Sequence, residues 1–257
     1  MPGFWRQLFS NDHPVILAGP CAIENKSMYL QTARKLKEMG VHGLRGGVFK
    51  PRTSPYSFQG VGKKGLPWIK EAKEQTGLVT ITEVMSPEQV GPVSEYADIL
   101  QIGSRSMQNY PLLKEVGKTD MPVLLKRGMG SRLEELFYSA EYICSMGNTR
   151  IIFCERGIRT FETWTRFTFD INAIPIIKKE TNLPIIADPS HGVGISKYVP
   201  SVALAALAAG ADGILIEVHP CREVALSDGM QSLDFSEFEE LLQRIHQLFP
   251  QESRLIQ

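Results

Sequence analysis

Residues 122–128 read PVLLKRG, residues 150–157 read RIIFCERG and residues 184–190 read PIIADPS. In each stretch, a short apolar run of the length of a β-strand ends at ionisable side chains. The runs are apolar at nearly every position and do not alternate with polar residues, which is typical of strands buried on both faces of a parallel sheet. The sequence therefore predicts a parallel α/β fold.

The same unit recurs along the whole chain. Five further runs complete a set of eight strand candidates: VILAGP at 15–20, HGLRGG at 42–47, LVTITEV at 78–84, DILQIGS at 98–104 and GILIEVHP at 213–220. Amphipathic stretches lie between the runs, and the clearest of them predict helices over residues 27–40, 132–147, 195–210 and 235–249.

The spacing of the units favours a closed barrel. Cys21 and Glu217 follow or end the first and eighth runs and are 196 residues apart. One unit thus takes about 28 residues, which is normal for a (β/α)₈ TIM barrel. We expect a single (β/α)₈ barrel domain over residues 1–257, with the first fourteen residues as a short cap over its bottom. A doubly wound open sheet is the structural alternative.

Length and composition set the class of protein. The chain has 257 residues, of which 43% are hydrophobic, and its 28 Lys and Arg balance its 28 Asp and Glu. No net charge therefore draws it to nucleic acid or to an anionic membrane. It has no apolar run of about eighteen residues and no recognisable secretory leader. Its four cysteines are not closely paired, which is typical of reduced thiols. We expect a cytoplasmic protein that binds neither nucleic acid nor membrane.

The residues after each apolar run are the candidates for function, because the active site of such a barrel lies at the carboxyl ends of its strands. A single cation there is usually a solvated loop charge. Six cations that converge on one end of a neutral protein need anions to neutralise them, and Arg and Lys suit phosphate and carboxylate groups. These cations are Arg45, Lys50, Arg52, Arg105, Lys126 and Arg156. The pattern predicts a substrate with several negative charges.

A second group of residues near the strand ends can ligate a metal ion. It comprises Cys21, His191, Glu217 and Asp228. Each of them alone has a structural explanation, such as a buried small thiol or an aspartate in a turn. The first, seventh and eighth strand ends are adjacent only if the barrel closes, and the mixed sulfur, nitrogen and oxygen donors suit Zn²⁺, Mn²⁺, Fe²⁺ or Co²⁺. The sequence predicts one divalent metal ion and does not choose among these.

Other residues carry weaker signals. His219 is a candidate support for the ligands, while His13, His42 and His246 are interpreted as structural or surface residues. Cys221 could approach Cys21 under oxidation, although no spacing establishes that geometry. The chain has neither a GxGxxG dinucleotide motif nor a P-loop.

Seven motifs in order carry a family resemblance over nearly the whole chain: AGPCAIE, LRGGVFKPRTSPYSFQG, QIGSRSMQN, LLKRGM, ERGIRTFE, ADPSHGVG and IEVHPCREVALSDGMQSL. They resemble the short, type I beta form of 3-deoxy-D-arabino-heptulosonate 7-phosphate (DAHP) synthase, within the DAHP and 3-deoxy-D-manno-octulosonate 8-phosphate (KDO8P) synthase family. The resemblance implies a transferase that condenses phosphoenolpyruvate with erythrose 4-phosphate, the first step of the shikimate pathway. It also implies a barrel with one divalent metal ion and a homotetramer.

The resemblance also implies roles for individual residues. The metal ligands would be Cys21, His191, Glu217 and Asp228, of which Cys21 and His191 would be catalytic together with Lys126. Phosphoenolpyruvate would bind to Arg45, Lys50, Arg105, Lys126 and Arg156, the erythrose phosphate to Arg52 and Thr53, and Glu83 would lie beside the enolpyruvate. Lys126 is the candidate proton donor or acceptor, because an ammonium crowded by other cations gives up its proton more readily.

Two alternative functions stay open. KDO8P synthase would take arabinose 5-phosphate, but that family usually reads KANRSS where this chain reads KPRTSP at 50–55. A non-catalytic barrel that binds phosphorylated metabolites would be expected to have lost some of these side chains. We also expect no feedback inhibition by tyrosine or phenylalanine through a domain in cis, and a partner chain that regulates in trans stays open. The aromatic loop at 157–170 is predicted to be a folded lid or an interface.

Overall fold

The computed structural model describes residues 8–9 and 13–250. Its parallel strands form a closed barrel in chain order, in which β8 pairs with β1. The strands are β1 (Val15–Gly19), β2 (Gly43–Arg45), β3 (Val79–Val84), β4 (Ile99–Ile102), β5 (Val123–Lys126), β6 (Ile151–Glu155), β7 (Ile185–Ala187) and β8 (Gly213–Glu217). The closed sheet confirms the predicted (β/α)₈ barrel and its eight strands, and excludes the open sheet.

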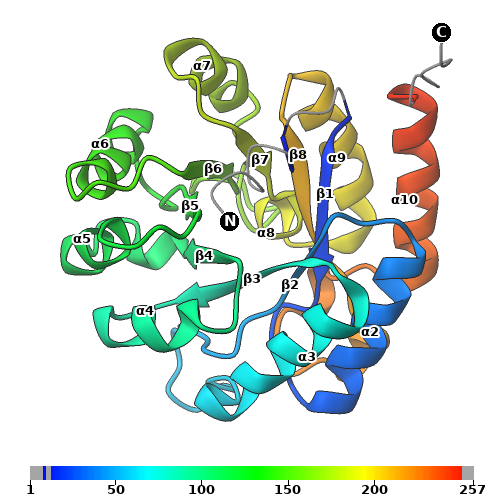
Figure 1. Ribbon diagram of the computed structural model, residues 1–257. Helices are drawn as coiled ribbons and strands as arrows, with labels where there is room; N and C mark the ends of the chain where they lie inside the picture. The colour runs from blue at the N-terminus through cyan, green and yellow to red at the C-terminus, as the bar shows by residue number, and fades with distance from the viewer. Residues whose placement is uncertain (1–7, 10–12, 251–257) are drawn as a thin grey trace, which may run out of the picture.

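Helices surround the barrel, as Figure 1 shows. They are α2 (Lys26–Glu38), α3 (Leu66–Thr76), α4 (Pro87–Ser94), α5 (Tyr110–Gly117), α6 (Leu133–Cys144), α7 (Ala173–Glu180), α8 (Pro189–Val193), α9 (Val199–Ala208) and α10 (Phe235–Leu248). The four predicted helices are present with small shifts at their ends. The largest shift is at α9, which begins only at Val199 after a 3₁₀ turn and has Pro200 in its first turn, where no backbone donor is needed. Within the described part of the chain, no helix is both long enough and apolar enough to cross a bilayer.

Successive strand residues point alternately to two apolar cores. On β1, Ile16 and Ala18 pack in the layer between strands and helices, whereas Val15 and Leu17 fill the inside of the barrel. Leu8 and Phe9 pack against the inner cluster, which agrees with the predicted cap. The other residues of that cap, apart from His13 and Pro14, lie outside the described residues.

At the carboxyl ends of seven strands, the side chain that points into the barrel is polar or charged. Two positions beyond an inward residue such as Ile81 or Leu124, the next inward side chain is charged or polar, here Glu83 or Lys126. The buried polar layer formed in this way comprises Arg45, Glu83, Gln101, Lys126, Arg156, Asp188 and Glu217. Strand periodicity within the closed barrel therefore places these seven side chains together above an apolar floor.

Candidate active site

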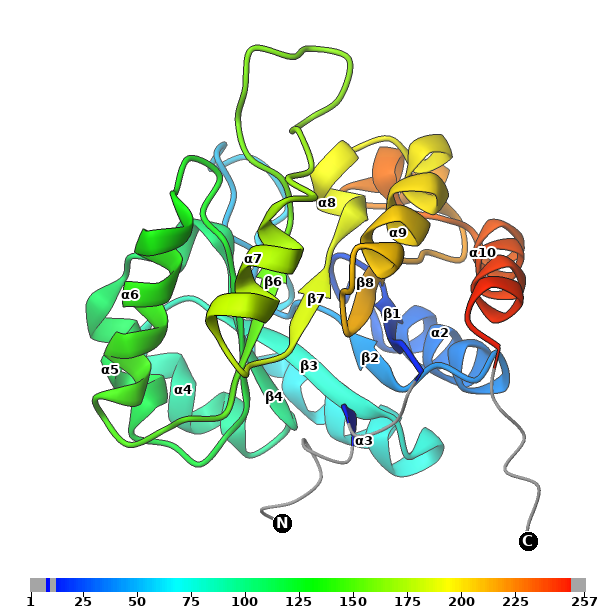
Figure 2. The same cartoon turned by 90° about the horizontal axis from the view of Figure 1, so that it is seen from above.

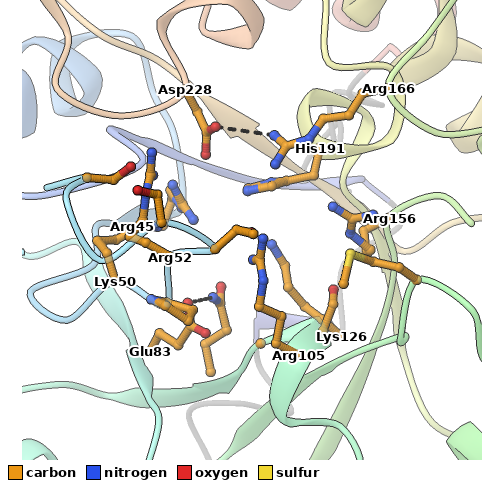
Figure 3. Close-up of a pocket in the computed structure, with 18 residues that line it drawn as sticks. Arg45, Lys50, Arg52, Glu83, Arg105, Lys126, Arg156, Arg166, His191 and Asp228 are labelled. Atoms are coloured by element: carbon orange, nitrogen blue, oxygen red, sulfur yellow. Dashed lines mark hydrogen bonds and ion pairs between the residues drawn. The ribbon is translucent and has the colours of Figure 1, made fainter. Parts of the chain in front are cut away.

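A cavity of about 230 Å³ opens over this polar layer. Figure 3 shows that cationic side chains point into it from several sides. They are Arg45, Lys50, Arg52, Arg105, Lys126, Arg156 and Arg166. All six predicted cations therefore line one cavity, together with Thr53, Glu83, His191 and Asp228. The sequence did not predict Arg166, because it lies in the long loop after β6, ten residues beyond the candidate Arg156.

Two of these cations are paired with carboxylates below the cavity. Nη1 of Arg45 lies 2.8 Å from Oε1 of Glu217, and both side chains are at most 3% exposed. The ammonium of Lys126 pairs with the buried carboxylate of Asp188. Burial disfavours the charged form of Asp188, but His191 and Lys126 outweigh it and hold the pKa of Asp188 well below its usual range. These contacts fix the side chains before any ligand binds.

Four of the other cations have no carboxylate partner in the described part of the chain: Lys50, Arg52, Arg105 and Arg156. Burial lowers the pKa of Arg156 to about 10, so Arg156 still carries its charge at neutral pH, and its guanidinium lies 4.1 Å from the centre of the Phe167 ring. Lys50 donates to the backbone oxygen of Cys21 at 3.0 Å, and Arg52 donates to Oγ of Ser227 at 2.7 Å. These charges remain available for an anionic ligand, and Arg105 is exposed at the rim.

Glu83 and Gln101 form one side of the cavity wall. Nε2 of Gln101 donates to Oε2 of Glu83 at 3.3 Å, and both side chains are buried. Gly103 makes room for this carboxylate, because a Cβ at that position would lie 1.9 Å from Oε1 of Glu83. A larger residue at position 103 would have to displace Glu83.

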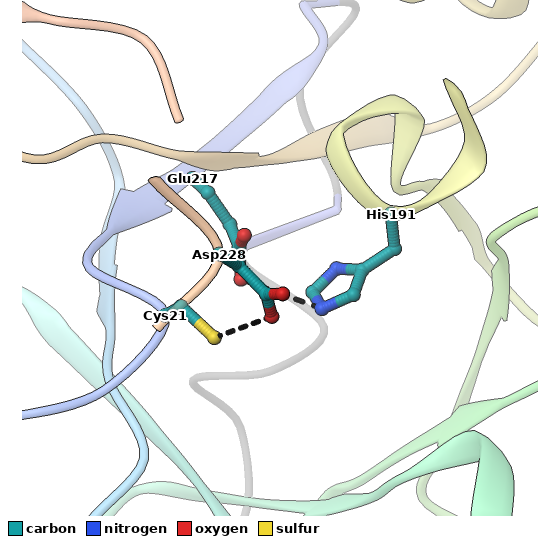
Figure 4. Close-up of side chains that lie close together, drawn as sticks. All are labelled: Cys21, His191, Glu217 and Asp228. Atoms are coloured by element: carbon teal, nitrogen blue, oxygen red, sulfur yellow. Dashed lines mark hydrogen bonds and ion pairs between the residues drawn. The ribbon is translucent and has the colours of Figure 1, made fainter. Parts of the chain in front are cut away.

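The four predicted metal ligands also meet, at the edge of the same cavity. Cys21, His191, Glu217 and Asp228 each offer one ligand atom, and these atoms all lie within 4.8 Å of one another (Figure 4). Sγ of Cys21 lies 3.0 Å from Oδ2 of Asp228, and Nε2 of His191 lies 3.4 Å from Oε1 of Glu217. Closure of the barrel brings β1 and β8 together and so joins side chains about 200 residues apart.

The chemistry of these donors fits a divalent ion of borderline softness. Burial, with further contributions from Glu217 and Asp228, raises the pKa of Cys21 to about 12. Burial also lowers the pKa of His191, which favours the neutral imidazole that a metal needs. Asp228 has the only positive φ among the described non-glycine residues, at 54°. Such a backbone commonly marks a constrained functional position.

Neighbouring polar groups hold the ligands in place. Nδ1 of His191 lies 2.8 Å from Oδ2 of Asp188, which leaves Nε2 directed at the other ligands. Gln231 donates to Glu217, and Arg166 pairs with Asp228. The sequence showed that Asp188 follows a strand, but it contained no signal for the roles of Gln231 and Arg166.

Arg127 and Glu155 point outward at the ends of their strands and form a separate ion pair. Nη1 of Arg127 lies 3.0 Å from Oε2 of Glu155 and 2.7 Å from Oδ2 of Asp170. Oε1 of Glu155 accepts from the backbone N–H of Gly157 at 2.6 Å. The pair anchors both ends of the loop at 157–170 and does not line the cavity.

The loop at 157–170 connects β6 to α7 and projects beyond the carboxyl end of the barrel, at the top of Figure 2. Its base is ordered by a bridge between Ile158 and Thr168. Phe167 is buried, but Phe161 and Trp164 are 96% and 79% exposed. The base is folded as expected, whereas the aromatic tip does not pack on the described chain, and its role as a lid or an interface stays a prediction.

The remaining histidines and cysteines match their interpretations in part. His42 is structural, because its Nδ1 accepts the backbone N–H of Ile16 at 3.0 Å. Nε2 of His219 lies 3.4 Å from Oε1 of Glu24, a neighbour of the ligand loops. Cys221 is exposed and Cys21 is buried, and both are free thiols.

Comparisons with known proteins show which sequences and folds this chain resembles. The profile described as the DAHP synthetase I family matches residues 7–252. The phospho-2-dehydro-3-deoxyheptonate aldolase of Thermotoga maritima is 54% identical over 238 residues, which cover 93% of this chain and 70% of that protein. A 2-dehydro-3-deoxyphosphooctonate aldolase of Nitratidesulfovibrio vulgaris is 32% identical over 252 residues, which cover 91% of each chain.

Two solved structures from Thermotoga maritima resemble the fold. A crystal structure of its phospho-2-dehydro-3-deoxyheptonate aldolase (DAHP synthase) has a TM-score of 0.90 and 53% identity, and the match covers 93% of this chain and 70% of the other. A truncated form of its 3-deoxy-D-arabino-heptulosonate 7-phosphate synthase has a TM-score of 0.86 and 50% identity, with 93% and 87% coverage.

Proposed function

The chain belongs to the DAHP synthetase I family, and we propose that its barrel condenses phosphoenolpyruvate with erythrose 4-phosphate to give DAHP and inorganic phosphate. The observation that carries the proposal is a single cavity lined by seven cations, with a four-donor metal cluster at its edge. The two substrates bring two phosphates and a carboxylate that repel one another. A dense set of fixed cations supplies the attraction needed to hold them together.

Different residues of the cavity would bind the two substrates. Arg105, Lys126 and Arg156, with Arg45 and Lys50, would hold the phosphate and carboxylate of phosphoenolpyruvate, and Glu83 would lie beside its enol group. Arg52 and Thr53 would receive the phosphate of erythrose 4-phosphate, since both line the cavity on the loop that follows β2. This arrangement would direct C3 of the enol toward the aldehyde carbon.

Cys21, His191, Glu217 and Asp228 would hold one divalent metal ion, and the donor set suits Mn²⁺, Fe²⁺, Zn²⁺ or Co²⁺. When bound, such an ion supplies Lewis acidity to the aldehyde carbonyl. The protein's own part is to present Nε2 of His191 and to exclude water from the buried thiol of Cys21.

Lys126 is the proposed general acid or base. After C3 attacks the aldehyde, water adds at C2 of the former phosphoenolpyruvate, and the C2–O bond to phosphate then breaks. These steps require protons to move at C2 oxygens, and the ammonium of Lys126 points into the cavity from its floor. Its pairing with Asp188 fixes its position for this transfer.

The alternatives have less support. Relatives named 2-dehydro-3-deoxyphosphooctonate aldolase are about 32% identical, against 54% for the heptonate enzyme. The KPRT segment of this chain also lines the cavity. A non-catalytic binding barrel would not need both a complete donor cluster and a lysine at the cavity floor.

The test is phosphate release from phosphoenolpyruvate by protein stripped of metal with a chelator. Erythrose 4-phosphate and arabinose 5-phosphate are compared, each without added metal and with added Mn²⁺, Fe²⁺, Zn²⁺ or Co²⁺. We expect Mn²⁺-dependent release with erythrose 4-phosphate. A preference for arabinose 5-phosphate would move the function to KDO8P synthesis, and no release with either sugar under any of the four metals would contradict catalysis by this chain.

Assembly, location and regulation belong to the same proposal. A homotetramer is proposed from the family resemblance, and the exposed Phe161 and Trp164 offer apolar surface for a contact between copies. A cytoplasmic location suits four free cysteines, one of which must stay reduced to bind metal. Regulation by a partner chain in trans would be seen as a change in kcat or KM when that chain is added.

A further inference from the structure

Gln231 lies in the loop after β8 and is 2% exposed. Its Nε2 donates to Oε2 of Glu217 at 2.6 Å, and its Oε1 accepts from Nη1 of Arg166 at 2.7 Å. One buried amide therefore uses both of its ends. It connects a candidate metal ligand to a cation from a different loop.

Arg166 continues the connection to a second ligand. Its Nη1 also lies 3.2 Å from Oδ1 of Asp228. Its backbone N–H donates to the carbonyl oxygen of Val193 at 2.9 Å. Gly194 has φ of 73°, and a Cβ there would lie 2.4 Å from Cβ of Arg166. Because Gly194 has no side chain, the base of the loop at 157–170 packs closely against the end of α8. This packing directs the side chain of Arg166 toward the loop that carries Asp228.

Gln231 and Arg166 each bind the carboxylate oxygen that does not face another ligand. Oε1 of Glu217 faces Nε2 of His191 at 3.4 Å and also accepts from Nη1 of Arg45 at 2.8 Å, while Oε2 accepts from Gln231. Oδ2 of Asp228 faces Sγ of Cys21 at 3.0 Å, while Oδ1 is held by Arg166. The contact on the far oxygen fixes the rotation of each carboxylate, so that its other oxygen is directed at the cluster.

We propose that Gln231 and Arg166 are positioning residues that orient Glu217 and Asp228 for the metal and couple the loop at 157–170 to that site. The inference deepens the proposed function and rests on its metal site. Groups that hydrogen-bond to metal ligands typically affect metal affinity by about 10-fold to 100-fold. Gln231 is the better probe, because its replacement changes no charge near the ion.

The test measures the affinity of metal-free protein for Co²⁺ alone, by competition with a chromophoric chelator, together with the visible spectrum of the bound Co²⁺. We expect Gln231→Met to bind Co²⁺ about 10-fold to 100-fold more weakly and to change the spectrum, since the geometry of the oxygen ligands would relax. Far-UV circular dichroism in chelator confirms the fold of each variant.

Arg166→Gln is a second variant, in which the direction of the change in Co²⁺ affinity distinguishes two effects. Removal of a positive charge near the ion should by itself tighten the binding of Co²⁺, whereas loss of positioning should weaken it. We expect weaker binding. The matched control is Arg159→Gln, because Arg159 lies in the same loop and is exposed. Its side chain makes no hydrogen bond or ion pair with the described part of the chain and does not line the cavity. We expect the affinity of this control to stay within about threefold of the wild type.

The outcomes separate this inference from the proposal beneath it. Wild-type protein that binds no Co²⁺ would overturn the metal site and the inference with it. Wild-type binding with unchanged affinity and spectrum in Gln231→Met would overturn the inference alone. Should Gln231→Met fail to fold, Arg166→Gln decides, and an affinity equal to or tighter than that of the wild type refutes the positioning role.

Discussion

Lys126→Met tests the proposed chemistry most directly. The side chain is 4% exposed, and its ammonium pairs with Asp188, which is fully buried. Removal of one partner of a buried ion pair costs about 3–5 kcal/mol, because the remaining charge stays buried. Asp188 keeps two hydrogen bonds from His191, from the backbone N–H at 3.0 Å and from Nδ1 at 2.8 Å, so the lower end of that range applies.

A loss of about 3 kcal/mol lowers the melting temperature of a protein of this size by about 6–12 °C. The expected loss of activity is far larger than such destabilisation explains at 25 °C. General acid–base catalysis contributes about 10²-fold to 10⁴-fold, so kcat for phosphate release should fall by at least about 100-fold. The assay follows phosphate from phosphoenolpyruvate and erythrose 4-phosphate, with circular dichroism to confirm that the variant is folded.

Arg127→Met is the matched control on the next residue of the chain. It also breaks a buried ion pair, with Glu155 and Asp170, but the side chain lies outside the cavity. We expect a similar fall in melting temperature with kcat within about tenfold of the wild type. Full turnover by Lys126→Met, or equal losses in the two variants, would refute the role of Lys126 in proton transfer.

Three further changes test other parts of the structure. Gly103→Ala should raise KM for phosphoenolpyruvate in steady-state kinetics, because the added Cβ would lie 1.9 Å from Oε1 of Glu83 and must displace it; an unchanged KM would contradict a substrate contact at Glu83. Arg105→Ala should weaken phosphoenolpyruvate binding by calorimetry yet alter the free energy of unfolding by no more than about 0.5 kcal/mol, since the side chain is exposed. Burial lowers the pKa of His42 from 6.5 in the folded protein. As the pH falls below 6.5, the unfolded chain therefore protonates His42 before the folded chain does. The free energy of unfolding is highest above pH 6.5 and decreases as the pH falls through the lower pKa of the folded state. In urea unfolding, the free energy of unfolding of His42→Gln should therefore decrease less between pH 7 and about pH 5.5 than that of the wild type. The difference in slope should be at most about 1.4 kcal/mol per pH unit.

The strand pattern determined more than the fold class. Apolar runs such as those at 122–128 and 150–157 predicted parallel strands, and their number and spacing predicted the closed barrel. Since active sites of such barrels lie at strand ends, the six predicted cations could be named from local sequence, and all six line one cavity. The ligand candidates Cys21 and Glu217 were found in the same way.

Tertiary structure alone decided how these groups are held. Arg166 and Gln231 lie in two long loops, where the alternation of side chains along a strand predicts nothing about their direction. The hydrogen bond between them joins positions 65 residues apart. The direction of Lys126 into the cavity and of Arg127 away from it depends on strand register, which the sequence of a single strand leaves undefined. Local sequence predicts which residues end a strand, because that is a matter of short-range pattern. Which of them meet across the barrel depends on long-range packing, and only the folded chain determines it.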